Sequence, residues 1–246
     1  MKFLLYIFIV TVFMSACDED PAQKAVDQSI AEHGGELFQN VHIEFDFRNR
    51  HYVSHRQEGI FTYTREFPDS SGHIKDVLTN DRFHREINGG LAKISEERAK
   101  AFTNSVNSVI YFALLPYGLN DRAVIKKYIK ETEIKGKKYD LIKVTFQEDG
   151  GGKDHEDVFL YWIEKDSHTL DYFAYSYETD GGGVRFREAV NRRAVEGITF
   201  QDYINYEPKT PDATLEDMEA LYKNGQLKKL SDIILENIEV RLLPKT

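Results

Sequence analysis

Four runs of aromatic and β-branched residues decide the fold: 157–165 (DVFLYWIEK), 170–178 (LDYFAYSYE), 184–193 (VRFREAVNRR) and 198–206 (ITFQDYINY). Short polar or glycine-rich segments separate them, namely KDSH at 165–168, DGGG at 180–183 and EG at 196–197. Such runs at regular spacing are typical of strands joined by hairpins. The stretch 150–207 therefore predicts an antiparallel meander.

In the first two runs the apolar residues fall on both alternate sets of positions. In the first run, Phe159, Tyr161 and Ile163 form one alternate set, while Leu160 and Trp162 belong to the other. A strand that is apolar on both faces is normally covered on both faces. We therefore expect other elements to pack against each side of this meander.

The N-terminus resembles a secretory signal. Lys2 precedes an apolar run at 3–14, and small residues follow it before Cys17. A short apolar run with this flanking pattern is typical of a signal peptide. We expect residues 1–16 to be the signal peptide, 17–24 a tether and 25–246 a single domain.

Charge and cysteine content exclude several classes of protein. The formal net charge is −9 and Cys17 is the only cysteine. A lone cysteine forms no internal disulfide. An acidic chain lacks the clustered Lys and Arg that phosphate contacts need, so we expect no nucleic-acid partner. The sequence contains neither a GxSxG elbow nor a P-loop, and it indicates no cofactor.

The remaining chain predicts further strands and four helical segments. Helices are expected at 25–33, 95–115, 121–130 and 214–223. Strands are expected at 41–48, 59–67, 73–79 and 82–87, and a hairpin, with its turn at Lys135-Gly136, over 133–147. The tail is also expected to form a strand, in which Ile234, Ile238, Val240 and Leu242 share a side. With the central meander this gives about ten or eleven strands. The fold class is mainly β (α+β): a large curved antiparallel sheet or open barrel around a mid-chain helical plug.

The helix expected at 95–115 has an apolar stripe at helical spacing. Its residues Phe102, Val106, Val109 and Phe112 are expected to point into the concave side of the sheet, against the central meander. Pro116 then ends the helix, because proline does not continue one.

This layout resembles the LolA/LolB-like family of bacterial envelope proteins. The features that carry the resemblance are an N-terminal helix, a meander, a mid-chain helix and a second meander with Tyr161-Trp162 before a charged turn and Gly197 before a strand. The segments 104–109 (NSVNSV), 154–157 (DHED) and 181–187 (GGGVRFR) resemble an uncharacterised lipoprotein family of Bacteroidetes-type bacteria. Residues 15–17 (SAC) resemble a lipobox. The resemblance implies a lipid on Cys17 and a hydrophobic cavity for acyl chains.

Candidate ligand-binding residues are aromatic or cationic. We expect an aromatic wall and a pair of guanidinium groups for a carboxylate or phosphate head group. The alternatives are plain core packing for the aromatic residues and cross-strand pairing with Asp171, Glu178 or Glu188 for the arginines. The candidates are Phe102, Phe112, Tyr117, Trp162, Tyr172, Phe186, Arg185 and Arg187.

An acidic cluster could hold a metal ion. Asp154, His155, Glu156 and Asp157 are consecutive, but their spacing matches neither HExxH nor the calcium loop. The alternative is a solvated acidic hairpin loop. We assign no metal site and no catalytic residue.

The leading hypothesis is a non-enzymatic lipoprotein of the bacterial envelope that binds an apolar or amphipathic ligand, such as a lipid or a lipoprotein acyl chain. The alternatives are a surface interaction or glycan-binding module with a packed interior and, third, an envelope hydrolase. A continuous apolar pocket favours the first over the second. The expected partners are the membrane, through the lipid, and an apolar ligand or envelope protein. The leaflet stays open between the periplasmic side and the cell surface.

Overall fold

The strands form two antiparallel sheets of seven strands each. The computed structural model describes residues 19–147, 157–177 and 182–245. The first sheet, in spatial order, consists of β14 (Glu236–Leu242), β1 (Val41–Phe47), β2 (Arg50–Gln57), β3 (Ile60–Asp69), β4 (Gly72–Thr79), β5 (Phe83–Ile87) and β6 (Gly90–Leu91). The second consists of β13 (Leu227–Ile233), β12 (Ile198–Pro208), β11 (Gly183–Val195), β10 (Leu170–Tyr177), β9 (Val158–Glu164), β8 (Lys137–Phe146) and β7 (Val124–Ile134).

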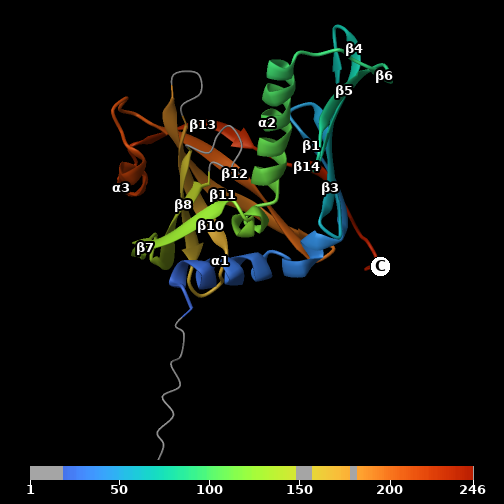
Figure 1. Cartoon of the computed structure of the whole chain (residues 1–246). Coiled ribbons are helices and arrows are strands. Elements are labelled where there is room, and N and C mark those ends of the chain that lie inside the picture. The colour runs from blue at the N-terminus through green and yellow to red at the C-terminus, as the bar shows by residue number, and fades with distance from the viewer. Residues whose placement is uncertain (1–18, 148–156, 178–181, 246) are drawn as a thin grey trace, which may run out of the picture.

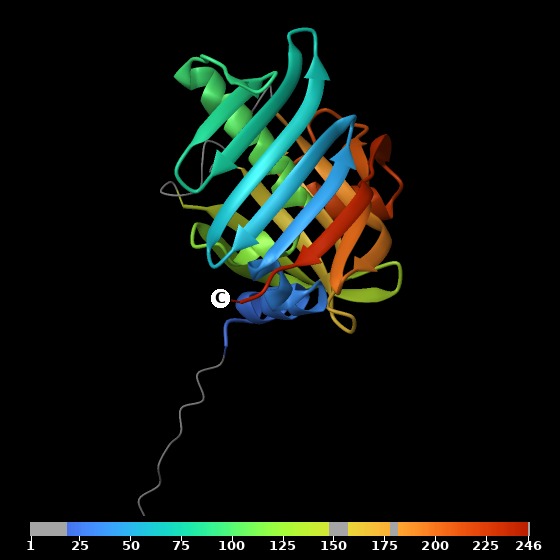
Figure 2. The ribbon, with the colours of Figure 1, turned by 90° about the vertical axis from the view of Figure 1, so that its right-hand side faces the viewer.

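Three α-helices pack around these sheets (Figure 1). The first, α1 (Pro21–Glu32), runs across the bottom of the molecule in this view. The long helix α2 (Glu96–Ala113) stands between the sheets, and α3 (Met218–Lys223) lies beside the second sheet, on the side away from α2. Figure 2 shows the outer face of the first sheet, with its strands running diagonally above α1. Short 3₁₀ helices occupy η1 (Gly35–Gln39), η2 (Tyr117–Asn120) and η4 (Leu215–Asp217).

The central meander is covered on both faces, as its sequence predicts. Phe159, Tyr161 and Ile163 belong to a core cluster that includes residues of α1. Leu160 and Trp162 belong to a second cluster on the opposite face, which includes residues of η4 and α3. The two alternate apolar sets of β9 therefore serve two separate cores.

The predicted mainly β fold with a mid-chain helix is confirmed. The strands divide into two sheets that do not close into a barrel, and the two sheets share one core cluster. Ile198 and Phe200 of β12 belong to this cluster together with Val41 and Phe45 of β1. All four side chains are at most 1% exposed, so this cluster joins the sheets into one packed unit.

The predicted helix at 121–130 is wrong. This segment belongs mostly to β7, an edge strand that pairs with β8. Ile125 and Ile129, four residues apart, imitate a helical stripe, yet they are 47% and 41% exposed. The turn that was predicted at Lys135-Gly136 does join β7 to β8.

Other boundaries also differ from the prediction. Helix α1 begins at Pro21, four residues earlier than expected, because the Asp20 side chain caps it by accepting a hydrogen bond from the Ala22 N–H at 2.9 Å. Strands β2 and β13 were not predicted. Ile234 does not share a buried side with the tail: it lies between β13 and β14 and is 46% exposed.

The predicted helix at 95–115 is confirmed, and its apolar residues contact both sheets. Ser95 caps α2 by accepting a hydrogen bond from the Arg98 N–H. Val106 and Val109 pack in the cluster shared with the first sheet, and Phe102 lies against Phe83 of β5. Of the four predicted residues, Phe112 is the one whose ring contacts the central meander. The expected contact with that meander is therefore corrected for Phe102, whereas Val106 and Val109 belong to a cluster that includes Ile198 and Phe200 of β12.

No described helix has both the length and the apolar character that a membrane-spanning helix requires.

Candidate ligand-binding cavity

A cavity of about 220 Å³ lies between α2 and the inner face of the second sheet. One face of α2 forms one wall, and β11 and β12 form the other. The β1–β2 turn and the segment that follows β13 complete it. The lining residues are Phe47, Arg48, Ser108, Val109, Phe112, Ala113, Arg187, Gln201, Tyr203, Asn205, Ile233 and Leu235.

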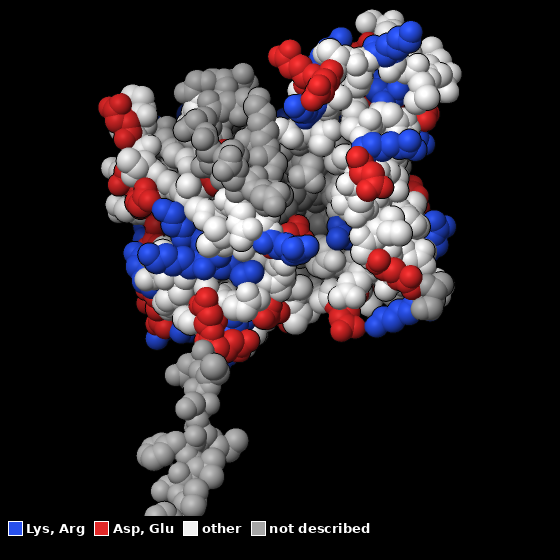
Figure 3. All heavy atoms as spheres, viewed as in Figure 1, with Lys and Arg blue, Asp and Glu red and all other residues white. Residues whose placement is uncertain are grey.

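The charge of this lining contrasts with the rest of the chain. Two of the lining residues are arginines and none is Asp or Glu, although the formal net charge of the chain is −9. On the face shown in Figure 3, acidic and basic side chains are interspersed and form no single basic field. The cavity is therefore a local positive site in an acidic protein.

Arg187 is the buried cation of the cavity. It lies on β11 opposite Phe173 of β10 and Asn205 of β12, and it is 8% exposed. Its guanidinium carbon is 4.4 Å from the centre of the Phe112 ring and 5.2 Å from those of Phe173 and Tyr175. Cations are attracted to the faces of aromatic rings at such distances. These contacts hold the guanidinium in place without neutralising its charge.

Two buried polar atoms at the cavity lack a partner among the described residues. One is Nε of Arg187, and the other is Oδ1 of Asn205 on the neighbouring strand. Arg187 donates one hydrogen bond, from Nη2 to the Tyr175 hydroxyl at 3.1 Å. Asn205 donates from Nδ2 to the Ser231 hydroxyl at 3.3 Å. Buried polar atoms are usually paired, so these two are suited to contact a bound molecule.

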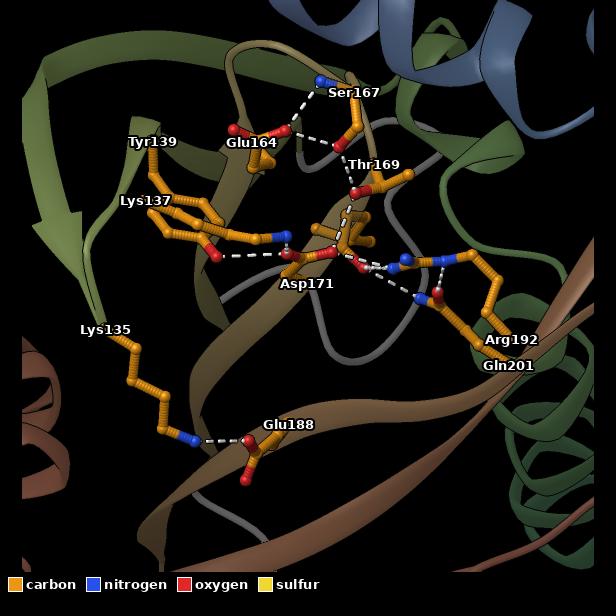
Figure 4. A network of polar contacts seen from close by, with 11 residues as sticks. Lys135, Lys137, Tyr139, Glu164, Ser167, Thr169, Asp171, Glu188, Arg192 and Gln201 are labelled. Carbon is orange, nitrogen blue, oxygen red and sulfur yellow. Dashed lines mark hydrogen bonds and ion pairs between the residues drawn. The ribbon is translucent and has the colours of Figure 1, made fainter.

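A hydrogen-bonded chain fixes the polar wall of the cavity (Figure 4). Gln201 donates to the Tyr203 hydroxyl at 2.8 Å and to the Leu170 carbonyl at 3.0 Å. Arg192 orients the Gln201 amide by donating from Nε to its Oε1 at 3.1 Å, and Arg192 also donates to Asp171 at 2.7 Å. Because the amide is held in this way, the Tyr203 hydroxyl accepts a hydrogen bond and keeps its own proton available.

Beyond Asp171 the same chain continues to the β9–β10 turn. Thr169 donates to Asp171 at 2.8 Å, and Ser167 donates to Glu164 through both its N–H and its hydroxyl. Burial opposes ionisation of Glu164, but the Ser167 hydrogen bonds outweigh it and hold the pKa of this carboxyl below its usual range. The polar wall of the cavity is thus anchored to a rigid turn.

The protonation of Tyr203 is fixed near neutral pH. Burial raises the pKa of Tyr203 to about 12, although the Gln201 hydrogen bond and nearby arginines oppose this shift. The residue is therefore a neutral hydroxyl in the cavity wall. Arg48 and Arg187 remain the only charged groups among the described lining residues.

The structure separates the aromatic residues that the sequence groups into one wall. Phe112 lines the cavity, whereas Trp162, Tyr172 and Phe186 pack on the opposite face of the second sheet. There the Phe186 ring stacks on Tyr222 of α3 with 4.6 Å between ring centres. The predicted single aromatic wall is therefore divided between the two faces of the second sheet, because successive residues of a strand face opposite sides.

Three other predicted residues also lie away from the cavity. Phe102 lies beneath the Arg85 guanidinium, 3.6 Å from ring centre to carbon. Tyr117 stacks on Phe38 at 4.7 Å and borders a separate hollow beside α1 that three carboxylates line, those of Asp27, Glu36 and Asp121. Arg185 lies over the Tyr177 ring at 5.1 Å and donates to the Val184 carbonyl. Of the eight candidate residues, Phe112 and Arg187 are the two that line the cavity.

Some candidates fall outside the described residues, namely Cys17, Asp154, His155 and Glu156. Asp157 is described and lies just before β9. Within the described ranges, no group of three or more His, Cys, Asp or Glu residues is arranged to hold a metal ion.

Sequence reasoning missed three polar residues of the cavity, namely Gln201, Tyr203 and Asn205. They occupy alternate positions of β12, so all three face the same side of the sheet. This alternation was the available signal. The run at 198–206 was interpreted only as a strand, because its aromatic and β-branched residues, such as Ile198, Phe200 and Ile204, are typical of an ordinary core strand.

Comparison with solved structures finds chains of similar layout at low sequence identity. A LolA superfamily protein from Nitrosomonas europaea is 12% identical, with a TM-score of 0.48 over 91% of this chain and 94% of that one. A DUF1329 family protein from Desulfovibrio piger is 10% identical, with a TM-score of 0.44 over 90% and 93%. A putative outer membrane lipoprotein-sorting protein domain from Vibrio parahaemolyticus is 6% identical, with a TM-score of 0.39 over 89% and 93%.

The expected LolA/LolB-like layout is thus found among these structural neighbours, but TM-scores below 0.5 give them no weight in the argument for function. No curated protein matches the sequence. A family model does match residues 2–237, and it carries no assigned activity, as the sequence resemblance implies. This match spans nearly the whole chain, which therefore belongs to the family of unknown function DUF6503.

Proposed function

We propose that this protein binds an amphipathic ligand in the cavity between α2 and the second sheet. The observation that carries the proposal is the composition of the lining: apolar side chains such as Val109, Phe112 and Ile233 surround the buried guanidinium of Arg187, which forms no ion pair with a described residue and whose Nε has no partner among them. Ligand sites are typically apolar cavities with a few well-placed polar groups. The cavity has this character.

The volume limits what the cavity accommodates. At about 220 Å³ it is smaller than the roughly 300–1,000 Å³ of typical ligand pockets. The ligand we propose is therefore a single acyl chain or one segment of a larger lipid, inserted between α2 and β12. Binding, not catalysis, is the proposed role, because the described lining pairs no nucleophile with a general base.

The proposed location is the bacterial cell envelope. The signal-like N-terminus and the lipobox-like residues before Cys17 support a lipid anchor on that cysteine. A lipid anchor would hold the domain beside a membrane, where amphipathic molecules are concentrated.

A second candidate function is a surface interaction or glycan-binding module. The burial of the neighbouring core favours it, since Val106 and Ile110 of α2 and Leu119 of η2 are at most 1% exposed. In this case the cavity would be a packing defect without a ligand.

The two functions can be distinguished with a variant in which a large side chain on α2 fills the cavity. Ser108→Trp places a large side chain in the lining, whereas Asn107→Trp places the same side chain on an exposed position of the same helix. Purified wild type and both variants are titrated with a neutral fluorescent apolar probe, and the wild type is also analysed by native mass spectrometry for co-purified lipid. We expect wild type and Asn107→Trp to bind the probe alike and Ser108→Trp to bind at least about tenfold more weakly, since most of the apolar contact is lost. If no lipid co-purifies and no probe binds, the interaction module replaces the carrier.

A further inference from the structure

The chain buries two arginines in different ways. Arg65 is 2% exposed and donates to the Asp76 carboxylate from Nε at 3.0 Å and from Nη2 at 2.5 Å. Arg187 is 8% exposed, and no described Asp or Glu forms an ion pair with it. A buried charge is normally paired, because removing it from water without a counter-charge is costly.

The unpaired state of Arg187 therefore needs an explanation, and its position supplies one. Its guanidinium lines the cavity, where Nε has no partner among the described residues. An arginine has five N–H donors, and a single one is used by a described residue, Tyr175. The remaining donors are available to a molecule that enters the cavity.

We propose that Arg187 binds the carboxylate of a fatty acid whose chain lies in the cavity. This inference rests on the proposed function and specifies its ligand class. A carboxylate matches the fork of a guanidinium group and supplies the missing negative charge. One buried cation also matches a singly charged head group better than the doubly charged phosphate of a phospholipid precursor.

The arrangement across the sheet orients such a ligand. Phe173, Arg187, Asn205 and Ser231 are register partners on successive strands, so the inner face changes from aromatic to polar along this row. A carboxylate at Arg187 would lie within reach of the Asn205 amide. The amide group can turn, because the Ser231 hydroxyl serves as either donor or acceptor.

The opposite wall suits the alkyl chain. Val109 and Ala113 of α2 face Ile233 and Leu235 across the cavity and present no charge to it. The Phe112 ring covers the guanidinium from the side of the helix and excludes water from it. Exclusion of water strengthens an ion pair with a bound carboxylate.

The test compares two ligands that differ in the head group alone. Decanoate and decanol are titrated calorimetrically into the full mature protein, as wild type, Arg187→Met and Arg185→Met. Arg185 is a matched control, because it lies on the same strand outside the cavity. We expect wild type and Arg185→Met to bind decanoate about 10–100-fold more tightly than decanol, the range typical of charge-assisted hydrogen bonds. Arg187→Met should lose this preference and still bind decanol.

A second measurement avoids the variants. Carbon-13 NMR of carboxyl-labelled decanoate bound to wild type should show a carboxyl pKa below that of the free acid, because a neighbouring guanidinium favours the ionised form. An unchanged pKa, or equal binding of decanoate and decanol by wild type, overturns the inference and leaves the proposed function standing. If neither ligand binds, the proposed function itself fails.

Discussion

Asp76 of β4 bridges two arginines on the neighbouring strands β3 and β5. It is fully buried and accepts hydrogen bonds from Arg65 and from Arg85, whose Nε and Nη2 lie 2.6 and 2.9 Å from its oxygens. We predict that Asp76→Asn lowers the free energy of unfolding by about 3–5 kcal/mol, because it leaves Arg65 buried without a counter-charge. Urea denaturation measures the change.

The matched control is a carboxylate on the neighbouring strand. Glu66 of β3 pairs with Lys75 at 2.9 Å near the surface. Glu66→Gln should cost less than about 1 kcal/mol, as is usual for exposed ion pairs. Equal effects of the two substitutions would show that the Asp76 network contributes no more than a surface pair.

At this scale the sequence left two roles open for the arginines of 184–193, namely binding of a head group and pairing with acidic residues of neighbouring strands. A regular strand would place Arg185, Arg187, Asn191 and Arg193 on one side. The register of β11 with β12 shifts between Val190 and Arg193. Asn191 and Arg193 consequently bind Asp202, at 3.1 Å each, and Arg187 alone of this set lines the cavity. The bulge separates Asn191 and Arg193 from the cavity, and because a bulge depends on the partner strand, the pattern of one strand could not reveal it. Arg185 precedes the bulge and lies over the Tyr177 ring instead.

Helix α2 is held mainly by its contact with the first sheet. Ile110 is 1% exposed in the cluster that both sheets share. We predict that Ile110→Ala lowers the free energy of unfolding by about 2–5 kcal/mol, because it leaves a cavity in a packed core. Chemical denaturation tests this, with Asn107→Ala on the exposed face expected within about 0.5 kcal/mol of wild type.

Phe102 should contribute less than a fully buried phenylalanine. It is partly exposed and contacts Phe83 and the Arg85 guanidinium. Phe102→Ala should therefore destabilise the protein by less than Ile110→Ala does. The reverse order would mean that the upper end of the helix determines its stability.

Helix and strand boundaries were predicted where local signals were strong. The central strands and α2 follow from the spacing of their apolar residues. Strand β2 was missed because its inward positions include Ser54, which is buried and polar. An edge strand such as β7 is defined by its neighbour, so its own sequence was ambiguous.

The whole molecule is expected to depend on Cys17 for membrane attachment. We predict that Cys17→Ser moves the protein from the membrane fraction to the soluble fraction, because the lipid is the attachment that the sequence indicates. Fractionation followed by immunoblotting measures this, and Ser15→Thr, two residues before the cysteine, is a control for changes in the signal itself. Retention of Cys17→Ser in the membrane fraction would contradict the lipid anchor.

The sequence predicts the fold class of the molecule but not how its strands are divided between sheets. Two meanders and a helix between them indicate a mainly β fold, and this is what the chain forms. The division into two sheets, and the cavity between them, depend on contacts such as that of Phe200 with the first sheet's core. Such long-range contacts leave no periodic signal in the sequence.

The pairing of β1 with β14 has a consequence for synthesis. The first strand of the chain bonds to the last, with Val41 opposite Leu242. The chain emerges from the N-terminus onward, in synthesis and in export alike, so one edge of β1 waits unpaired until residues 236–242 emerge. During that interval the open edge is exposed to association with other chains. Prematurely terminated products lack β14 altogether, and they should be the preferred substrates of chaperones and quality-control proteases.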